Sequence, residues 1–196
     1  MKSPIYWSPR LYTLAMKQLY GKQYEERFSV IAELIPDHSS VTEVCMGASE
    51  LFLNHLSEKD ISYTGLDLNS AFVKHAVKKG INARRHDLRM DPVPPADFVI
   101  IQDSLYQFIP HEKNILRKLL EASGKMLIVC EPVVNRAQSA NPLISFIAKR
   151  AADPGTGRMS KRFNEGSLMN CFKSFPEFKE AKKIAGGSEM LGIFLK

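Results

Sequence analysis

Two short apolar segments, each followed by a helical pattern, constrain the fold of this chain more than any other feature. The first starts at Val41, carries Glu43 and is followed by a turn that contains Gly47. The second ends at Asp67, 24 residues after Glu43. A strand, a tight turn, a helix and a second strand form a βαβ unit, which builds a parallel sheet with helices on both faces.

The alternation of strand and helix patterns continues through most of the chain. Apolar residues at helical spacing in residues 10–34 predict two N-terminal helices with a break near Gly21. Asn69 or Ser70 is expected to cap the helix after the second strand, and Gly186-Gly187 to join the last two strands as an antiparallel pair. Seven strands are predicted, at residues 41–46, 62–67, 81–86, 97–102, 125–130, 178–184 and 189–195. The predicted fold class is α/β, with a doubly wound, mostly parallel sheet.

The composition fits a single domain over residues 1–196. Hydrophobic residues make up 44% of the chain and charged residues 24%, as in ordinary globular proteins. No apolar stretch reaches the roughly 20 residues that a membrane span needs, and the first residues contain no apolar signal-peptide core. The three cysteines lie far apart, and neither they nor the histidines have the spacing of metal ligands. We therefore expect a cytoplasmic protein without a metal site.

Small and acidic residues stand where successive strands end. Glu43 and Gly47 belong to the first strand and its turn, whereas Asp67 and Asp87 close the second and third strands. In an open α/β sheet, ligands bind outside the carboxyl ends of the strands, and a carboxylate at the tip of the second strand accepts hydrogen bonds from ribose hydroxyls. This pattern predicts a site for a ribose-containing cofactor.

The order of these elements resembles that of class I S-adenosylmethionine-dependent methyltransferases over residues 24–195. The matching segments are Glu43–Ser49, Gly65–Asp67, His86–Leu88, Ala96–Gln102 and Gly124–Pro132. The resemblance implies a Rossmann-like sheet of seven strands in the order 3-2-1-4-5-7-6. In that family the first turn usually has three glycines. Here Cys45, Gly47 and Ser49 take their places, so only the central glycine is kept.

The resemblance assigns binding of the cofactor, S-adenosylmethionine, to Glu43, Gly47, Asp67, Leu68, Asp87, Leu88 and Gln102. Glu43 would face the methionine amino group, and the Gly47 backbone would cradle the cofactor. Asp67 would bind both ribose hydroxyls, and Asp87 would accept a hydrogen bond from the adenine amino group. Gln102 would meet the methionine end through its backbone. Simpler structural alternatives are a helix cap for Asp67 and a turn former for Asp87.

The loop after the fourth strand is expected to border the methyl acceptor. An Asp/Asn-Pro-Pro-aromatic motif, which resembles amino-methylating nucleic-acid enzymes, is absent there. The segment that replaces it, residues 102–108, looks more like small-molecule methyltransferases. The substrate-binding candidates are Asp103, Ser104, Tyr106, Glu131 and Asn135. No catalytic residue is assigned, because methyl transfer from a sulfonium depends mainly on in-line approach and exclusion of water.

Two segments that contribute no strand to the sheet are predicted to close the expected site. Residues 1–38 would form an N-terminal helical cap, and residues 133–165 an insertion between strands five and six. Residues 149–183 hold nine Lys or Arg residues and four acidic residues. This charge favours a small acceptor, including an anionic one, over nucleic acid, because no basic motif interleaved with aromatic residues accompanies it. The sequence leaves the oligomeric state open.

Two other classes of function stay open. A nicotinamide-dependent oxidoreductase also uses a glycine-rich turn and an acidic tip on the second strand. However, the Gly-x-Gly-x-x-Gly pattern is missing, and no Tyr-x-x-x-Lys pair follows the fourth strand. A non-catalytic module that kept the fold is compatible with the incomplete glycine turn. The sequence favours an enzyme that transfers a methyl group from S-adenosylmethionine over both alternatives.

Overall fold

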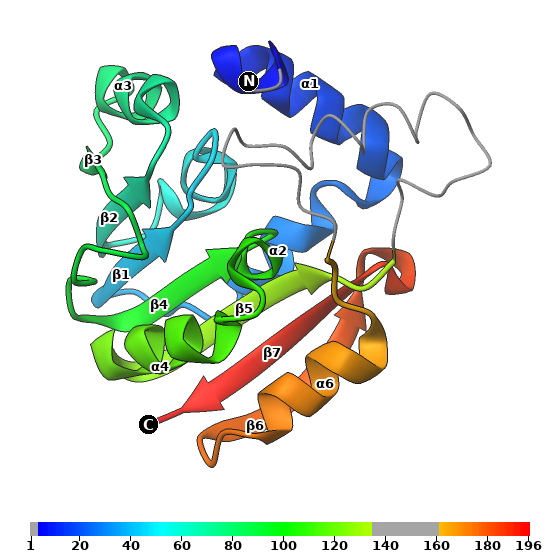
Figure 1. Ribbon diagram of the computed structural model, residues 1–196. Helices are drawn as coiled ribbons and strands as arrows, with labels where there is room; N and C mark the ends of the chain where they lie inside the picture. The colour runs from blue at the N-terminus through cyan, green and yellow to red at the C-terminus, as the bar shows by residue number, and fades with distance from the viewer. Residues whose placement is uncertain (1–3, 135–160) are drawn as a thin grey trace.

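Seven strands form one sheet in the order β3-β2-β1-β4-β5-β7-β6 (Figure 1). The computed structural model describes residues 4–134 and 161–196. The strands β1 to β5 pair in parallel, whereas β7 runs antiparallel to both β5 and β6. Their bounds are β1 Ser39–Val44, β2 Ile61–Asp67, β3 Ala83–Arg85, β4 Ala96–Gln102, β5 Ser123–Pro132, β6 Phe178–Ile184 and β7 Glu189–Leu195. The predicted fold class and strand order are confirmed.

The helices lie between these strands and before the first one. The α-helices are α1 Pro9–Tyr20, α2 Glu26–Ala32, α3 Ser70–Lys78, α4 Glu112–Ala122 and α6 Glu165–Lys173. The short 3-10 helices are η1 Pro4–Trp7, η2 Gly21–Gln23, η4 Leu105–Phe108 and η6 Ala185–Gly187, and η3 Phe52–Leu56 is a π-helical turn. The break predicted between the two N-terminal helices is present at Gly21, where φ is +56°. Asn69 caps α3, because its side chain accepts a hydrogen bond from the Ala71 amide.

Helices cover both faces of the sheet, as a doubly wound fold requires. On one face, residues of α1, α2 and α3, among them Ile31, join the same apolar core as Phe98 and Ile100 of β4. On the other face, α4 and α6 share a core with Val99 and Ile101. Successive strand residues point to opposite faces, so a central strand with both faces covered is apolar throughout. This explains the uninterrupted apolar run of β4.

The sheet changes its direction of growth between β1 and β4. The chain places β2 and β3 on one side of β1, and then β4 and β5 on the other side. At such a switch point the helices diverge and leave a crevice at the carboxyl ends of the two strands. The α1 helix, blue in Figure 1, lies across this end of the sheet. The fold thus brings the first turn, the loop after β4 and the N-terminal segment to one place.

Two local predictions differ from the structure. Cys45 and Met46 were expected in the first strand, but β1 ends at Val44 because Cys45 adopts a φ of +56°. The fifth strand was expected at residues 125–130, but β5 spans Ser123–Pro132, and Gly124 lies inside it, beside the Ala96 carbonyl of β4. Most of the insertion predicted at residues 133–165 falls outside the described residues.

Within residues 4–134 and 161–196, no helix has both the length and the apolar character for crossing a membrane. The same residues contain no group of three or more His, Cys, Asp or Glu side chains placed to hold a metal ion. All three cysteines are free thiols.

Candidate functional site

The turn after β1 has a left-handed backbone at all three positions where class I methyltransferases usually carry glycine. The φ angles are +56° at Cys45, +57° at Gly47 and +63° at Ser49. Glycine adopts this conformation readily, whereas other residues adopt it at a cost of roughly 1–2 kcal/mol. The turn therefore keeps the shape that three glycines would favour, although two of them are absent.

Replacing Ser49 by glycine is expected to leave the free energy of unfolding unchanged or to raise it by up to about 1 kcal/mol. The relief of left-handed strain offsets the larger chain entropy of glycine. The control is Ser57→Gly, where φ is −63° and glycine should lower the free energy of unfolding by about 0.5–1 kcal/mol. Urea denaturation measures both variants. Equal losses of stability in the two would contradict a strained Ser49.

Asp67, at the end of β2, holds this turn in place. Its Oδ2 accepts a hydrogen bond from the Gly47 amide at 2.9 Å, and its Oδ1 accepts one from the Asn69 amide at 2.7 Å. Asp67 is 9% exposed, and the neighbouring Leu68 is half-buried. The structure thus brings together Gly47 and Asp67, two cofactor-binding candidates from separate motifs.

Glu43 of β1 and Gln102 of β4 face each other beneath the turn. The Tyr63 hydroxyl donates to Glu43 Oε2 at 2.6 Å, and Gln102 Nε2 donates to Glu43 Oε1 at 3.1 Å. Burial raises the pKa of Glu43 to about 7, and these two hydrogen bonds only partly oppose that shift. The other amide atom, Gln102 Oε1, is buried and finds no partner among the described residues.

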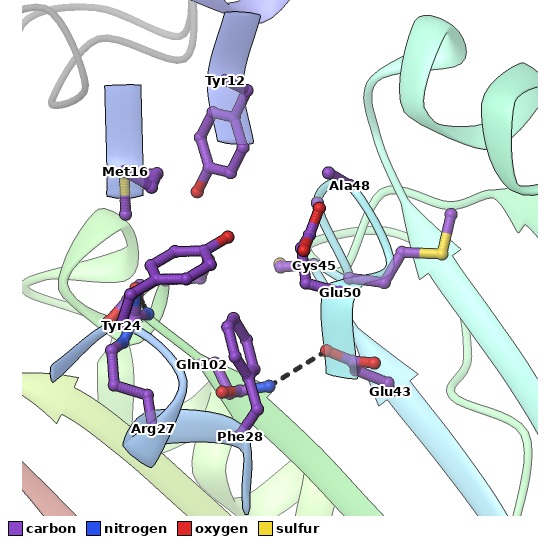
Figure 2. A pocket seen from close by; sticks show the side chains of 14 residues that line it. Tyr12, Met16, Tyr24, Arg27, Phe28, Glu43, Cys45, Ala48, Glu50 and Gln102 are labelled. Atoms are coloured by element: carbon purple, nitrogen blue, oxygen red, sulfur yellow. Dashed lines mark hydrogen bonds and ion pairs between the residues drawn. The ribbon is translucent and has the colours of Figure 1, made fainter. Parts of the chain in front are cut away.

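A small cavity lies above this pair, at the switch point between β1 and β4. Its volume is about 50 Å³. Glu43, the first turn and the residues at and after the end of β4 line one side of it, and Tyr12, Tyr24 and Phe28 of the N-terminal segment line it as well. Figure 2 shows the hydroxyl groups of Tyr12 and Tyr24 directed into the space in front of the first turn. Residues of the N-terminal segment therefore line the cavity on this side, and the role of residues 1–38 as a cap stays a prediction.

Arg27 of α2 forms a buried ion-pair network beside the cavity. Its Nη2 contacts Asp103 Oδ2, and its Nε lies 2.7 Å from Glu189 Oε1 of β7. The guanidinium also lies 4.0 Å from the centre of the Tyr20 ring, and Arg27 is 2% exposed. Asp103, a predicted acceptor-site residue, lines the cavity and is held by this arginine at a φ of +49°.

Glu131, also predicted to bind the acceptor, lies beneath the loop after β4 rather than in the cavity wall. It is fully buried, and its Oε1 accepts hydrogen bonds from the Ser104 and Leu105 amides at 2.6 Å each. The Tyr106 amide donates to its Oε2 at 3.3 Å. Burial raises the pKa of Glu131 to about 7 against the effect of these three amides. Glu131 therefore shapes the loop that carries Asp103.

The remaining acceptor-site candidates are distributed differently. Ser104 lines the cavity. Tyr106 is 5% exposed and does not line it; its ring is covered by the Arg162 guanidinium, 3.6 Å from the ring centre. Asn135 lies outside the described residues. Of the five candidates, the structure therefore brings Asp103 and Ser104 to the cavity.

Asp87 and Leu88 follow β3 at the edge of the sheet, away from the cavity lining. Asp87 Oδ1 accepts from the Arg89 amide at 3.0 Å, and the Asp87 amide donates to Asp91 Oδ2 at 2.8 Å. Leu88 is 4% exposed, and its carbonyl accepts from Lys118 Nζ at 2.9 Å. Asp87 thus stabilises its own turn, and its binding of adenine stays a prediction.

Arg27 is the site residue that sequence reasoning missed. A signal was present, because Tyr20, Tyr24, Arg27 and Ile31 recur at spacings of three and four residues, the pattern of a buried helical face. A charged residue on such a face needs a partner. Its partner Asp103 is 76 positions away, however, so no local pattern could identify it.

Comparison with known proteins now places the chain among its relatives. A family model described as methionine biosynthesis protein MetW matches residues 25–138, more than half of the 196 residues. The chain belongs to the MetW family. The matched segment of this MetW-family chain begins at α2 and ends just after β5, so it includes the first turn, Asp67 and the loop after β4. No curated protein matches the sequence.

Solved structures show which fold the MetW-family chain has. An O-methyltransferase family 2 protein from Planctomyces limnophilus DSM 3776, in complex with apigenin, has a TM-score of 0.64 and 15% identity, covering 96% of this chain but 60% of that one. A TehB-like SAM-dependent methyltransferase from Corynebacterium glutamicum ATCC 13032 Kitasato has a TM-score of 0.67 and 13% identity, covering 96% and 97%. Magnesium protoporphyrin IX methyltransferase from Synechocystis PCC 6803, with bound SAH, has a TM-score of 0.65 and 12% identity, covering 99% and 97%. The predicted class I methyltransferase fold is confirmed.

Proposed function

We propose that this protein binds S-adenosylmethionine and transfers its methyl group to a small-molecule acceptor. The observation that carries the proposal is the convergence of Glu43, the left-handed turn at Gly47 and the end of β4 around one cavity, with Asp67 bonded to that turn. This cavity lies at the switch point of the sheet, where ligands bind in open α/β folds. The chemistry of the groups present at this place supports a cofactor with a ribose and a cationic amino-acid end.

The donor and acceptor groups of the site fit that cofactor. Glu43 and the unpartnered Gln102 Oε1 are buried hydrogen-bond acceptors, which suit an ammonium group. Each carboxylate oxygen accepts more than one hydrogen bond, so Asp67 can bind ribose hydroxyls while it holds the Gly47 amide. The positive φ values from Cys45 to Ser49 keep the backbone of the turn open to close approach.

The size of the cavity adds a condition to the proposal. A volume of about 50 Å³ is far below the roughly 300–1,000 Å³ of ordinary small-molecule sites. The segment that covers the site must therefore move when a whole cofactor enters. Two of the hydrogen bonds that hold it run from Asn69 Nδ2 to the Tyr6 carbonyl at 2.9 Å and from Thr13 Oγ1 to Glu50 Oε1 at 2.7 Å. Met16, Leu19 and Tyr20 of α1 are also buried in the core, so this movement has to expose apolar surface.

S-adenosylmethionine supplies a methyl group on a positively charged sulfur. The residues of the chain would bind the cofactor, orient it and keep water away from it. Asp67 would fix the ribose, Glu43 would hold the ammonium group, and the rings of Tyr12 and Tyr24 would exclude water from the space next to Asp103. Exclusion of water and in-line placement are what such a transfer needs from its protein.

Isothermal titration calorimetry with S-adenosylhomocysteine and with NAD tests the proposal. We expect S-adenosylhomocysteine to bind with measurable heat and to raise the thermal unfolding midpoint, because it stabilises only the folded state, and NAD to do neither. Binding of NAD in its place would support an oxidoreductase. The absence of heat and of a thermal shift at millimolar S-adenosylhomocysteine would refute the proposal and favour a non-catalytic module.

A further inference from the structure

An apolar stripe is exposed on the outer side of the N-terminal segment. Trp7 is 64% exposed, Leu11 51% and Leu14 62%. Four further large apolar side chains are exposed among the described residues, but they lie on four separate segments. Single exposed apolar residues are common on protein surfaces, whereas several together mark a place of interaction. The stripe from Trp7 to Leu14 is therefore a candidate binding surface.

The α1 helix carries this stripe on the side opposite its buried face. Met16, Leu19 and Tyr20 are the buried residues of α1 and belong to the apolar core. Leu11 and Leu14 are three residues apart, so they share a face, and the helical period of 3.6 residues places that face away from the buried one. The buried face already attaches α1 to the sheet. The exposed stripe is thus free to contact something outside the chain.

The charges that accompany the stripe are all positive. Residues 1–24 contain four Lys or Arg residues and no Asp or Glu. Arg10 and Lys17 lie four and three residues from Leu14, which puts them on the same side of α1. Lys17 Nζ lies 3.6 Å from Glu25 Oε1, whereas Arg10 and Lys22 form no ion pair with any described residue. The stripe is therefore flanked by cations that stay available to an anionic partner.

The neighbouring helix α3 adds charge of the same sign. The rings of Tyr12 in α1 and Phe72 in α3 pack with 5.2 Å between their centres, and Figure 1 shows both helices at the same end of the molecule. Residues 70–80 contain three lysines and no acidic residue, and all three lysines are exposed. Both helices at this end thus carry cations and no anion.

We propose that α1 binds the surface of a membrane that contains anionic lipids, with Trp7, Leu11 and Leu14 inserted at the level of the head groups. Helices that lie in a membrane surface combine an apolar face with Lys or Arg residues that meet the lipid phosphates. Tryptophan is favoured at this depth because its ring is amphipathic. Such a helix lies along the membrane and need not span it, so the 12 residues of α1 suffice.

A nucleic acid fits this surface less well than a lipid bilayer. Its phosphates would pair with Arg10 and the lysines, but they would leave the exposed apolar stripe in water. The other side of α1 lines the cavity through Tyr12 and Met16, so binding to a membrane would hold the cavity close to the lipid surface. The inference does not depend on the proposed methyl transfer, because it rests on the outer side of α1 alone.

Trp7 is the only tryptophan of the chain, so its fluorescence reports on the stripe directly. The full chain is titrated with vesicles of phosphatidylglycerol and phosphatidylcholine, and with vesicles of phosphatidylcholine alone. We expect the anionic vesicles to shift the Trp7 emission to shorter wavelength and to bind roughly tenfold or more tightly than the neutral ones. Raising the salt from about 0.1 M to about 1 M should weaken binding, because the Debye length falls from roughly 10 Å to 3 Å. Absence of binding to the anionic vesicles, or binding without a shift of the Trp7 emission, would overturn the inference.

Variants that keep Trp7 assign the binding to α1. Leu11→Gln combined with Leu14→Gln should weaken binding to the anionic vesicles roughly tenfold or more, because glutamine keeps the helix propensity of leucine but removes its apolar surface. The control is Leu195→Gln, which changes a side chain that is 41% exposed near the C-terminus and should leave the affinity unaltered.

If the double leucine variant does not fold, Arg10→Gln combined with Lys22→Gln tests the same surface through its unpaired cations. The expected loss is again roughly tenfold or more, since each cation near an anionic surface contributes to binding. A duplex oligonucleotide serves as the competing polyanion. Unchanged vesicle affinity in a folded variant of α1, or tighter binding of the oligonucleotide than of the anionic vesicles, would overturn the inference.

Discussion

Asp67→Ala is expected to weaken S-adenosylhomocysteine binding by about 1.5–3 kcal/mol, or roughly 10- to 150-fold in Kd. Two losses contribute to this effect. The carboxylate no longer accepts hydrogen bonds from ribose hydroxyls, and the turn loses the acceptor of the Gly47 amide. Calorimetry at constant pH and salt measures the change in affinity. Thermal unfolding of the same variant separately measures the stability that is lost because two backbone amides no longer have the Asp67 carboxylate as their acceptor.

Two controls separate binding from folding. Asp67→Asn keeps one side-chain oxygen as an acceptor, so it should lose less affinity than Asp67→Ala. Glu58→Ala removes an exposed carboxylate and should change neither affinity nor stability. If Asp67→Ala is less stable but binds normally when folded, Asp67 only ties β2 to the turn, and its role at the ribose is wrong.

Affinity for S-adenosylhomocysteine should fall as the pH is lowered below 7. Burial raises the pKa of Glu43 to about 7 in the ligand-free protein, and an ammonium group binds the charged carboxylate. Below this pKa the proton must leave before the ligand binds, so Kd should rise about tenfold per pH unit. We expect binding at pH 5.5 to be roughly 30-fold weaker than at pH 8.

The Glu43→Gln variant provides the control. Its affinity should be low at all pH values between 5.5 and 8 and should not change with pH. An affinity of the unaltered protein that is constant across this range would show that Glu43 does not face the ammonium group.

Without ligand, the free energy of unfolding depends on pH with the opposite sign. The folded-state pKa values of Glu43 and Glu131 lie above the ordinary 4.5, so the stability they contribute is present at low pH. It is lost as the pH rises toward 7.

The sequence predicted the sheet well because its signals are local. The last two strands have the predicted bounds, Phe178–Ile184 and Glu189–Leu195, because the turn at Gly186 and Gly187 separates them. The first strand was predicted at residues 41–46, but β1 spans Ser39–Val44. Its end was missed because strand propensity does not reveal the left-handed φ of Cys45.

The site was predictable only where a residue's role follows from its place at a strand end. Gly47 and Asp67 meet as their positions suggest. The position of Glu131 beneath the loop was not predictable, because its three amide donors belong to a segment more than 20 residues earlier in the chain. The pairing of Arg27 with Asp103 depends on how α2 packs on the sheet. Such contacts arise from tertiary packing, which leaves no mark in the spacing of nearby residues.

The left-handed turn after β1 also bears on how distant relatives are recognised. Its handedness is imposed by its surroundings, including the hold of Asp67 on the Gly47 amide, and not by the residue types at Cys45 and Ser49. Mutation can therefore remove glycines from this motif at a modest and fixed energetic cost while the backbone path survives. A count of glycines would discard such chains as degenerate. In this chain, the carboxylate that anchors the turn identifies the motif where two of the three glycines are absent.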